Sequence, residues 1–195
     1  MDEYDYEDFL PRLDKCLEKA GSRYLAFILL GNHFHLLIVR GQRSLAELMR
    51  RLMTGYAVNF NLRHRRVGHL FQNRYKAVLC DFDSYLLELV AYIHLNPLRA
   101  GVVEDLRGLQ KDKWCGHGAL MGELDVGFLA EEDILGHFGE DIKRARRKYE
   151  SFIREQVGKY KRGELSSGGL RRSQGITSVR YSLKEQKRNY RMRGY

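Results

Sequence analysis

Gly31-Asn32-His33-Phe34-His35-Leu36-Leu37-Ile38 is the stretch that decides the fold, because it predicts a tight turn that opens into a strand with two histidines. Side chains of a strand alternate between its faces, so His33 and His35 leave one face while the apolar residues enter a core on the other. Two imidazoles on one rigid strand can bind one divalent metal. On spacing alone, a His-x-His pair is more often two satisfied or exposed histidines, so other residues have to support a site.

Length, composition and cysteine usage fit one soluble domain with an extension. The chain has 195 residues, of which 44% are hydrophobic, enough for a substantial core. Cys16, Cys80 and Cys115 form no Cys-x-x-Cys motif, which gives no sign of a thiolate zinc site or a disulfide framework and fits a reducing cytoplasm. The longest apolar run, residues 24–30, is too short to span a bilayer, and no targeting segment is visible.

The net charge of +9 is unevenly distributed. Residues 158–195 contain eleven Lys or Arg and two Glu, so residues 1–157 are neutral overall. Within that neutral part, residues 40–76 contain nine basic residues and a single acid, Glu47. A charged run is often only a solvated surface, but one that follows the histidine pair favours a polyanionic partner.

Hydrophobic periodicity and capping signals predict an α+β order of elements. The expected elements are a helix over residues 6–20 ended by Gly21, a hairpin of strands 23–30 and 33–39, a long helix behind a capping box of Ser44 and Glu47, a strand over residues 70–80, and a third helix from Ser84 to the Asn96-Pro97 pair. Later helices over residues 131–135 and 142–157 are expected to pack on this part. From Gly158 onward, glycine, serine and basic residues predict a flexible tail.

The third helix carries two polar side chains at the border of its apolar stripe. Successive helical residues are rotated by about 100°, which places Tyr92 and Asn96 one turn apart on the same edge. If that edge faces the histidine pair, a tyrosine hydroxyl and an amide oxygen meet the same metal. Each signal alone has a plainer explanation, since such a tyrosine is usually a packing residue and Asn before Pro is usually a helix stop.

Three blocks follow one another along the chain: Asn32-His33-Phe34-His35-Leu36-Leu37, then Val67-Gly68-His69-Leu70-Phe71-Gln72-Asn73-Arg74-Tyr75-Lys76, then Tyr92-Ile93-His94-Leu95-Asn96-Pro97-Leu98-Arg99-Ala100-Gly101. Together they resemble the IS200-like single-tyrosine (Y1) transposases, most closely the REP-associated tyrosine transposases. The resemblance extends over about residues 5–155.

The resemblance implies the HUH endonuclease fold, a ferredoxin- or RRM-like antiparallel sheet with helices packed on one face. It divides the chain into a catalytic domain over residues 1–110, a helical extension over residues 111–157 that packs on it, and a basic tail over residues 158–195. The family's fold normally begins with a strand that this sequence lacks, so we expect a sheet without its first strand. Either translation begins upstream of Met1, or the copy is truncated and leaves main-chain groups of an inner strand unpaired.

The family's functional residues are carried over by these blocks. The resemblance implies that His33, His35 and Asn96 bind Mg²⁺ or Mn²⁺ and that Tyr92 is the nucleophile. The implied activity is cleavage and transfer of single-stranded or hairpin DNA through a 5′-phosphotyrosine. We expect a cytoplasmic, nucleoid-associated monomer or homodimer with DNA as its partner and no contact with membranes.

The basic residues expected to follow DNA phosphates are Arg43, Arg50, Arg51, Arg63, Arg65, Arg66, Arg74 and Lys76. Phe71 and Tyr75 are candidates for stacking on unpaired bases. Tyr56 is a weaker candidate because it lies on the apolar stripe of its helix, where core packing is expected.

Two other functions are compatible with the sequence. A truncated or domesticated relative would bind DNA hairpins without cutting them. A metallohydrolase would activate a water at His33 and His35, but it needs a third strong ligand and a general base, and no His-Glu-x-x-His motif or acidic cluster supplies them.

Overall fold

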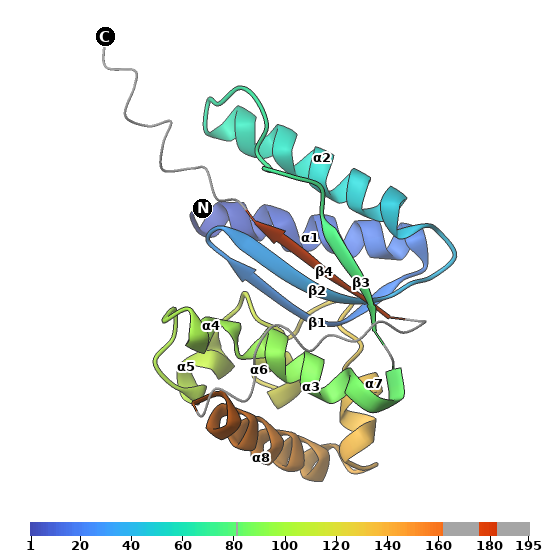
Figure 1. Ribbon diagram of the computed structural model, residues 1–195, viewed down its shortest axis with the longest axis vertical. Helices are drawn as coiled ribbons and strands as arrows, with labels where there is room; N and C mark the ends of the chain where they lie inside the picture. The colour runs from blue at the N-terminus through green and yellow to red at the C-terminus, as the bar shows by residue number, and fades with distance from the viewer. Residues whose placement is uncertain (81, 162–175, 183–195) are drawn as a thin grey trace.

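The computed structural model describes residues 1–80, 82–161 and 176–182, which form an α+β fold (Figure 1). In chain order its elements are α1 (Glu3–Ala20), β1 (Arg23–Leu30), β2 (His33–Val39), α2 (Leu45–Arg63), β3 (Lys76–Cys80), α3 (Phe82–His94), α4 (Asn96–Arg99), α5 (Leu106–Lys111), α6 (His117–Met121), α7 (Glu131–Leu135), a 3-10 turn (Gly136–Phe138), α8 (Ile142–Lys161) and β4 (Ile176–Ser182). The strands form one antiparallel sheet in the order β1-β2-β4-β3.

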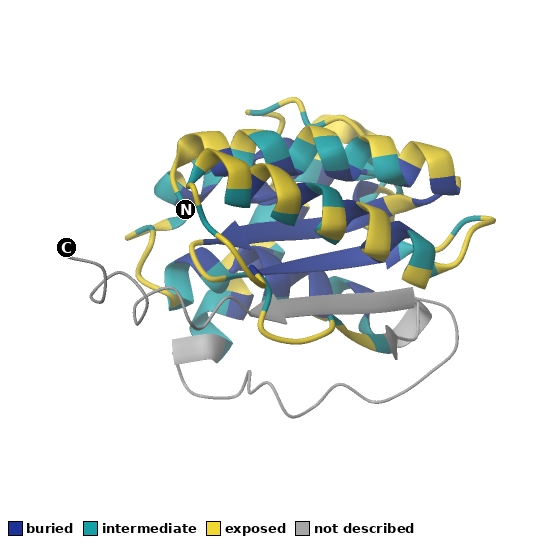
Figure 2. Cartoon of the chain, turned by 90° about the horizontal axis from the view of Figure 1, so that it is seen from above, coloured by how far each residue is buried: buried dark blue, intermediate teal, exposed yellow. Residues whose placement is uncertain are grey.

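Helices cover both faces of this sheet, so the expectation of helices on one face is wrong. Figure 1 shows α1 and α2 on one side and α3 to α8 on the other. Two adjacent residues of β2 face opposite layers of helices. The ring of Phe34 packs 4.9 Å from the ring of Phe9 on α1, and the ring of His35 lies 6.0 Å from that of Tyr92 on α3. Because β1 and β2 are buried along nearly their whole length (Figure 2), each face needs its own cover.

The hairpin predicted from the opening stretch is confirmed. β1 and β2 pair antiparallel across the Gly31-Asn32 turn, with Leu30 opposite His33 and Ile28 opposite His35. The short turn fixes this register, and the register decides which face each β2 side chain occupies.

Helix α1 begins at Glu3, three residues before the predicted start, and its C-cap is Gly21 as expected. The earlier start has a clear cause, because the carboxylates of Asp2 and Asp5 each accept a hydrogen bond from the other's backbone N–H, at 3.2 and 2.8 Å. At the other end Gly21 has φ of 60°, a conformation that favours glycine and ends the helix.

Helix α2 is confirmed, but only half of its predicted capping box forms. The Ser44 hydroxyl accepts from the Glu47 backbone N–H at 3.2 Å, whereas the Glu47 carboxylate pairs with Arg43 at 2.7 Å and Arg51 at 3.2 Å. The following strand is shorter than predicted, since β3 begins at Lys76 and residues 70–75 form irregular chain.

The inner position of the sheet, which was expected to lack a strand, is occupied by β4. β4 pairs with β2 on one side and β3 on the other, with Val39 and Cys80 both in register with Ile176. The first element of the chain is indeed α1, but the consequence drawn from that, an inner strand with unmade hydrogen bonds, is wrong. Of the predicted flexible tail, residues 158–161 complete α8 and 176–182 form β4, while residues 162–175 and 183–195 lie outside the described part.

The outer edge of β1 is covered by residues from the 111–157 segment. Backbone hydrogen bonds join Leu29 N–H to the Trp114 carbonyl at 2.9 Å, Gly116 N–H to Phe27 at 3.1 Å, and Ala130 N–H to Tyr24 at 2.9 Å. These bonds protect an edge that would otherwise be open to strand pairing.

A buried polar contact lies inside the α3 to α8 layer. The hydroxyl of Tyr149 on α8 is 2.9 Å from Nδ1 of His94 and 3.0 Å from Nδ1 of His117. One hydroxyl carries one proton, so it donates to one imidazole and accepts from the other. Burial lowers the pKa of both imidazoles, that of His117 to about 4, and they stay neutral at pH 7.

We predict that Tyr149→Phe lowers the free energy of unfolding by about 2 kcal/mol, because it leaves two buried Nδ1 atoms without their shared partner. Urea unfolding followed by the fluorescence of Trp114, the only tryptophan, measures the change. Tyr4→Phe is the control, since the side chain of Tyr4 is 69% exposed. Equal losses in the two variants would contradict the role of the buried hydroxyl.

The same histidines predict how stability depends on pH. An unfolded histidine has a pKa of about 6.5, above that of folded His117, so acid favours the unfolded chain. The free energy of unfolding should therefore fall as the pH is lowered from about 6.5 to about 4, with His117 alone contributing about 3 kcal/mol. Urea unfolding at pH steps across this range tests it, and a flat or rising profile would refute the assignment.

Candidate active site

The two histidines lie at the start of β2, on the face covered by α3. His35 is 3% exposed, and His33 is partly exposed beside the turn. Their ring centres are 5.3 Å apart and the rings are nearly perpendicular, at 85°. The Asn32 side-chain oxygen lies 2.7 Å from Nδ1 of His33, which orients that ring. The strand thus places both imidazoles on one face, as its alternation predicts.

Tyr92 comes from α3 and lies beside His35, the buried member of the histidine pair. Its half-buried ring lies 6.0 Å from the ring of His35, at an angle of 89°. The apolar stripe of α3, which includes Leu86, Leu89 and Ile93, is buried, and Tyr92 is on its border as the helical period predicts. The contact therefore joins the second strand of the hairpin to a helix nearly sixty residues later.

Asn96 follows one helical turn after Tyr92. It does not merely end α3, because it is also the first residue of a new helix. α3 ends at His94, and α4 starts at Asn96 with Pro97 in its first turn. The Asn96 side-chain nitrogen donates to the carbonyls of Tyr92 at 2.7 Å and Ile93 at 3.3 Å. Because the NH₂ group of Asn96 points at these carbonyls, the side-chain oxygen of Asn96 points away from them and remains able to accept a hydrogen bond or bind a cation.

The separation of the two imidazole rings is close to the one that a shared divalent ion would require. Two imidazoles bound to one ion at about 2.1 Å per nitrogen have ring centres roughly 5 Å apart, close to the separation of 5.3 Å between His33 and His35. A histidine that binds a metal through one ring nitrogen usually has a hydrogen bond at the other nitrogen, which orients the ring. The contact between Asn32 and Nδ1 of His33 is of this kind. Imidazole nitrogens together with an amide oxygen suit Mn²⁺ better than Mg²⁺.

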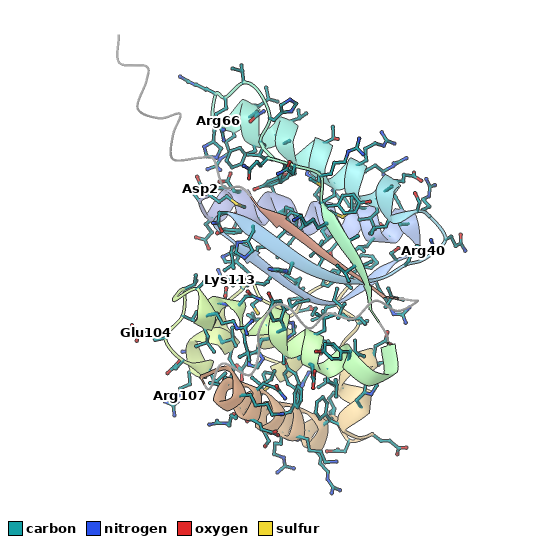
Figure 3. All side chains as sticks on the ribbon, in the orientation of Figure 1. Asp2, Arg40, Arg66, Glu104, Arg107 and Lys113 are labelled. Atoms are coloured by element: carbon teal, nitrogen blue, oxygen red, sulfur yellow. The ribbon has the colours of Figure 1, made fainter. Side chains whose placement is uncertain are left out.

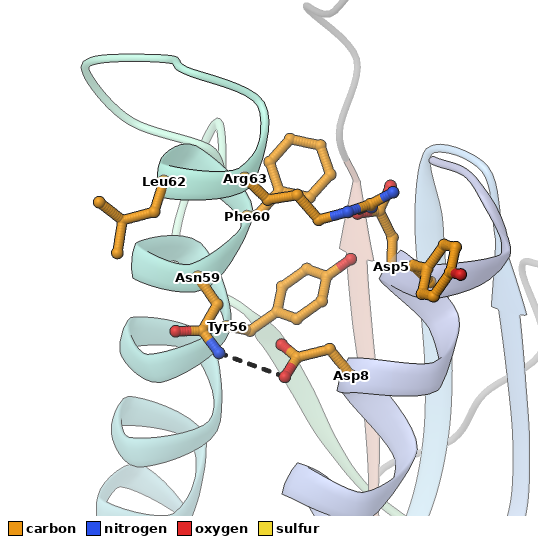
Figure 4. A pocket seen from close by; sticks show the side chains of 8 residues that line it. Asp5, Asp8, Tyr56, Asn59, Phe60, Leu62 and Arg63 are labelled. Atoms are coloured by element: carbon orange, nitrogen blue, oxygen red, sulfur yellow. Dashed lines mark hydrogen bonds and ion pairs between the residues drawn. The ribbon is translucent and has the colours of Figure 1, made fainter.

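A second cluster of ligand-type residues lies elsewhere and already contains a cation. Among the described residues, Asp2, Asp5 and His64 form a group of three whose ligand atoms are within 4.8 Å of one another. Arg63 enters this group, pairing with Asp5 at 2.6 Å and also with Asp2, while Nε2 of His64 is 2.9 Å from Asp5. Figure 4 shows Arg63 reaching from α2 toward Asp5 on α1. The hydrogen bond from Arg63 lowers the pKa of Asp2 to about 2.

Half of the eight basic residues predicted to bind DNA already contact an acid or an aromatic ring. Arg43 and Arg51 pair with Glu47, Arg63 pairs with Asp2 and Asp5, and Arg66 lies over the ring of Phe60. Arg40 and Arg66, both in the basic stretch over residues 40–76, lie at opposite ends of the α2 layer (Figure 3). Four exposed members of the predicted set form no ion pair with an acid among residues 1–80, 82–161 and 176–182: Arg50, Arg65, Arg74 and Lys76.

Of the three aromatic residues considered for stacking on bases, only Tyr56 lies in the core. Tyr56 is 2% exposed and packs against Phe9, which confirms core packing as its role. Phe71 and Tyr75 are partly exposed.

Arg99 is the residue near this site that the sequence did not single out. Its guanidinium carbon lies 4.7 Å from the centre of the Tyr92 ring. Arg99 belongs to the third sequence block. It is seven residues after Tyr92 and on the next helix, so the spacing in the sequence does not predict that the two side chains are in contact.

Comparison with models of protein families, with curated proteins and with solved structures finds no match to this chain. Within the part of the chain that the structure describes, no helix is both long enough and apolar enough to cross a membrane. Any assignment of function therefore depends on the residues of the site.

The Arg63 cluster yields a prediction about stability. Arg63→Met should lower the free energy of unfolding by clearly more than its control, because the Asp5 side chain is 2% exposed and loses its closest cation. Chemical unfolding measures the loss. Arg154→Met is the matched control, since its pair with Glu150 on α8 leaves Arg154 65% exposed and should contribute less than about 0.5 kcal/mol. A loss no larger than that of the control would mean that the cluster does not hold α1 to α2.

Proposed function

We propose that the protein is a metal-dependent endonuclease and strand transferase that cleaves single-stranded or hairpin DNA through a 5′-phosphotyrosine on Tyr92. The observation that carries the proposal is the contact of the Tyr92 ring with His35, which itself lies against His33. The Asn96 side chain is held one helical turn further on, anchored next to this contact through the backbone carbonyl of Tyr92. The resemblance to the single-tyrosine transposases assigns roles to these same four residues.

The proposed reaction exchanges one phosphoester for another. The Tyr92 hydroxyl gives its proton to water, and its oxygen attacks the phosphorus. The bond from phosphorus to the 3′ oxygen then breaks, and that oxygen leaves with the bonding electrons and takes a proton from solvent. The 5′ end remains bound to Tyr92, so attack by another 3′-hydroxyl rejoins the strand without an external energy source.

Each residue of the site has a defined task in this scheme. His33, His35 and Asn96 would hold Mg²⁺ or Mn²⁺, which supplies positive charge for the phosphate oxygens and the leaving 3′ oxygen. Asn32 orients His33 through the 2.7 Å contact at Nδ1. The carbonyls of Tyr92 and Ile93 orient Asn96. These hydrogen bonds would hold the proposed metal ligands in place before DNA binds, so that less reorganisation is needed during the reaction.

The sheet gives further support to an active enzyme over a truncated remnant. β4 pairs with β2 along His33–Val39, so the strand that carries the histidines is bonded on both edges. A histidine pair on a strand with one open edge would move more freely. DNA would be drawn to the site by cations that are not already paired with acids, and Lys76 at the start of β3 and Arg74 beside it are the exposed members nearest to the sheet.

The decisive test is a covalent adduct. Purified protein is incubated with labelled DNA hairpins and Mn²⁺, and we expect a complex that survives denaturant. Tyr92→Phe should abolish it, a chelator should prevent it, and His35→Ala should reduce it at least about 100-fold through loss of positioned charge. Tyr85→Phe, on the same helix, is the matched control and should form the adduct normally.

The outcomes separate the functions that the sequence left open. Hairpin binding that weakens steeply with salt, without an adduct, would favour a non-catalytic hairpin-binding protein. Hydrolysis that continues in Tyr92→Phe would favour a metallohydrolase. An adduct that persists in Tyr92→Phe would place the nucleophile elsewhere.

A further inference from the structure

Arg99 makes a close contact with the proposed nucleophile. The guanidinium carbon of Arg99 lies 4.7 Å from the centre of the Tyr92 ring, well within the range of an attractive contact between a cation and an aromatic face. Both side chains are half-buried. The contact is therefore partly shielded from water, which strengthens it relative to one on an open surface.

The local backbone holds Arg99 where it can reach back to Tyr92. The N–H of Arg99 donates to the Leu95 carbonyl at 3.1 Å, and Ala100 N–H donates to Asn96 at 2.8 Å, so α4 is fixed to the end of α3. Gly101 follows with φ of 66°, a conformation that lets the chain turn away. Side chains of a helix lean toward its N-terminus, which directs Arg99 toward the preceding helix.

The Tyr92 ring thus has a defined neighbour on two sides. His35 meets it at 89° with ring centres 6.0 Å apart, and Arg99 lies over its face. A ring with contacts from a strand and from a second helix has little freedom to rotate about its side-chain bonds. That restriction matters for an oxygen that has to attack a phosphorus in line with the leaving group.

We propose that Arg99 is a positioning residue for Tyr92, a guanidinium that clamps the phenol ring against His35 so that its oxygen faces the phosphodiester. The proposal rests on the function proposed above. Arg99 acts through the ring, and the bonds made and broken are those already described. A planar guanidinium stacks on a ring more effectively than an ammonium group, so lysine should replace it only in part.

The test separates positioning from DNA binding and from folding. With Mn²⁺ and a labelled hairpin, Arg99→Gln should lower the single-turnover rate of adduct formation about 10- to 100-fold. Its dissociation constant for the hairpin should stay within about twofold of the wild type, because the role of Arg99 lies in orienting the nucleophile. Arg99→Lys keeps the charge, preserves the fold if glutamine does not, and should show an intermediate rate. Arg107→Gln, at an exposed site on α5, is the matched control and should match the wild type.

A second readout needs no activity. The ring resonances of Tyr92, identified in tyrosine-labelled protein by their loss in Tyr92→Phe, should shift in Arg99→Gln and stay unchanged in Arg107→Gln. Unchanged ring resonances, an unchanged adduct rate, or a loss of hairpin affinity equal to the loss of rate would each overturn the role of Arg99. A wild-type protein that forms no adduct while the ring resonances shift as expected would overturn the proposed function instead.

Discussion

The site depends on the hydrogen bonding of β2 along both of its edges. β1 pairs with one edge across a two-residue turn, and β4 pairs with the other. A strand bonded on both sides cannot slide by one residue without breaking two ladders, and a slip of one residue would move His33 and His35 to the opposite face. The double pairing therefore keeps the imidazoles on the side where α3 presents Tyr92.

Predictions from the sequence succeeded where the determining interactions are local. The hairpin, the C-terminal end of α1 at Gly21 and the start of α2 at Ser44 depend on residues a few positions apart. The alternation of side chains along the strand predicted the face of His35, and the helical period predicted the face of Tyr92. These two faces contact each other in the structure. No local signal fixes how a strand and a later helix are juxtaposed, so that contact was a hypothesis until the fold was known.

The features that the sequence did not predict depend on distant partners. Arg63 was assigned to DNA because it lies in a basic run, yet its acidic partners Asp2 and Asp5 precede it by about sixty residues. The segment Ile176-Thr177-Ser178-Val179-Arg180-Tyr181 does have the β-branched and aromatic alternation of a strand. The polar composition of the residues around this segment obscured the strand pattern. Its position between β2 and β3 depends on the tertiary fold and not on any local signal.

The position of β4 in the chain has a consequence for folding during synthesis. Its two neighbours in the sheet are complete by residue 80, whereas β4 begins at residue 176. While the ribosome makes residues 81–175, β2 and β3 expose unpaired main-chain groups to each other and to other chains. Closure of the sheet is then a late event that requires a long loop to close. A nascent chain is therefore most exposed to wrong strand pairing in the interval before β4 emerges.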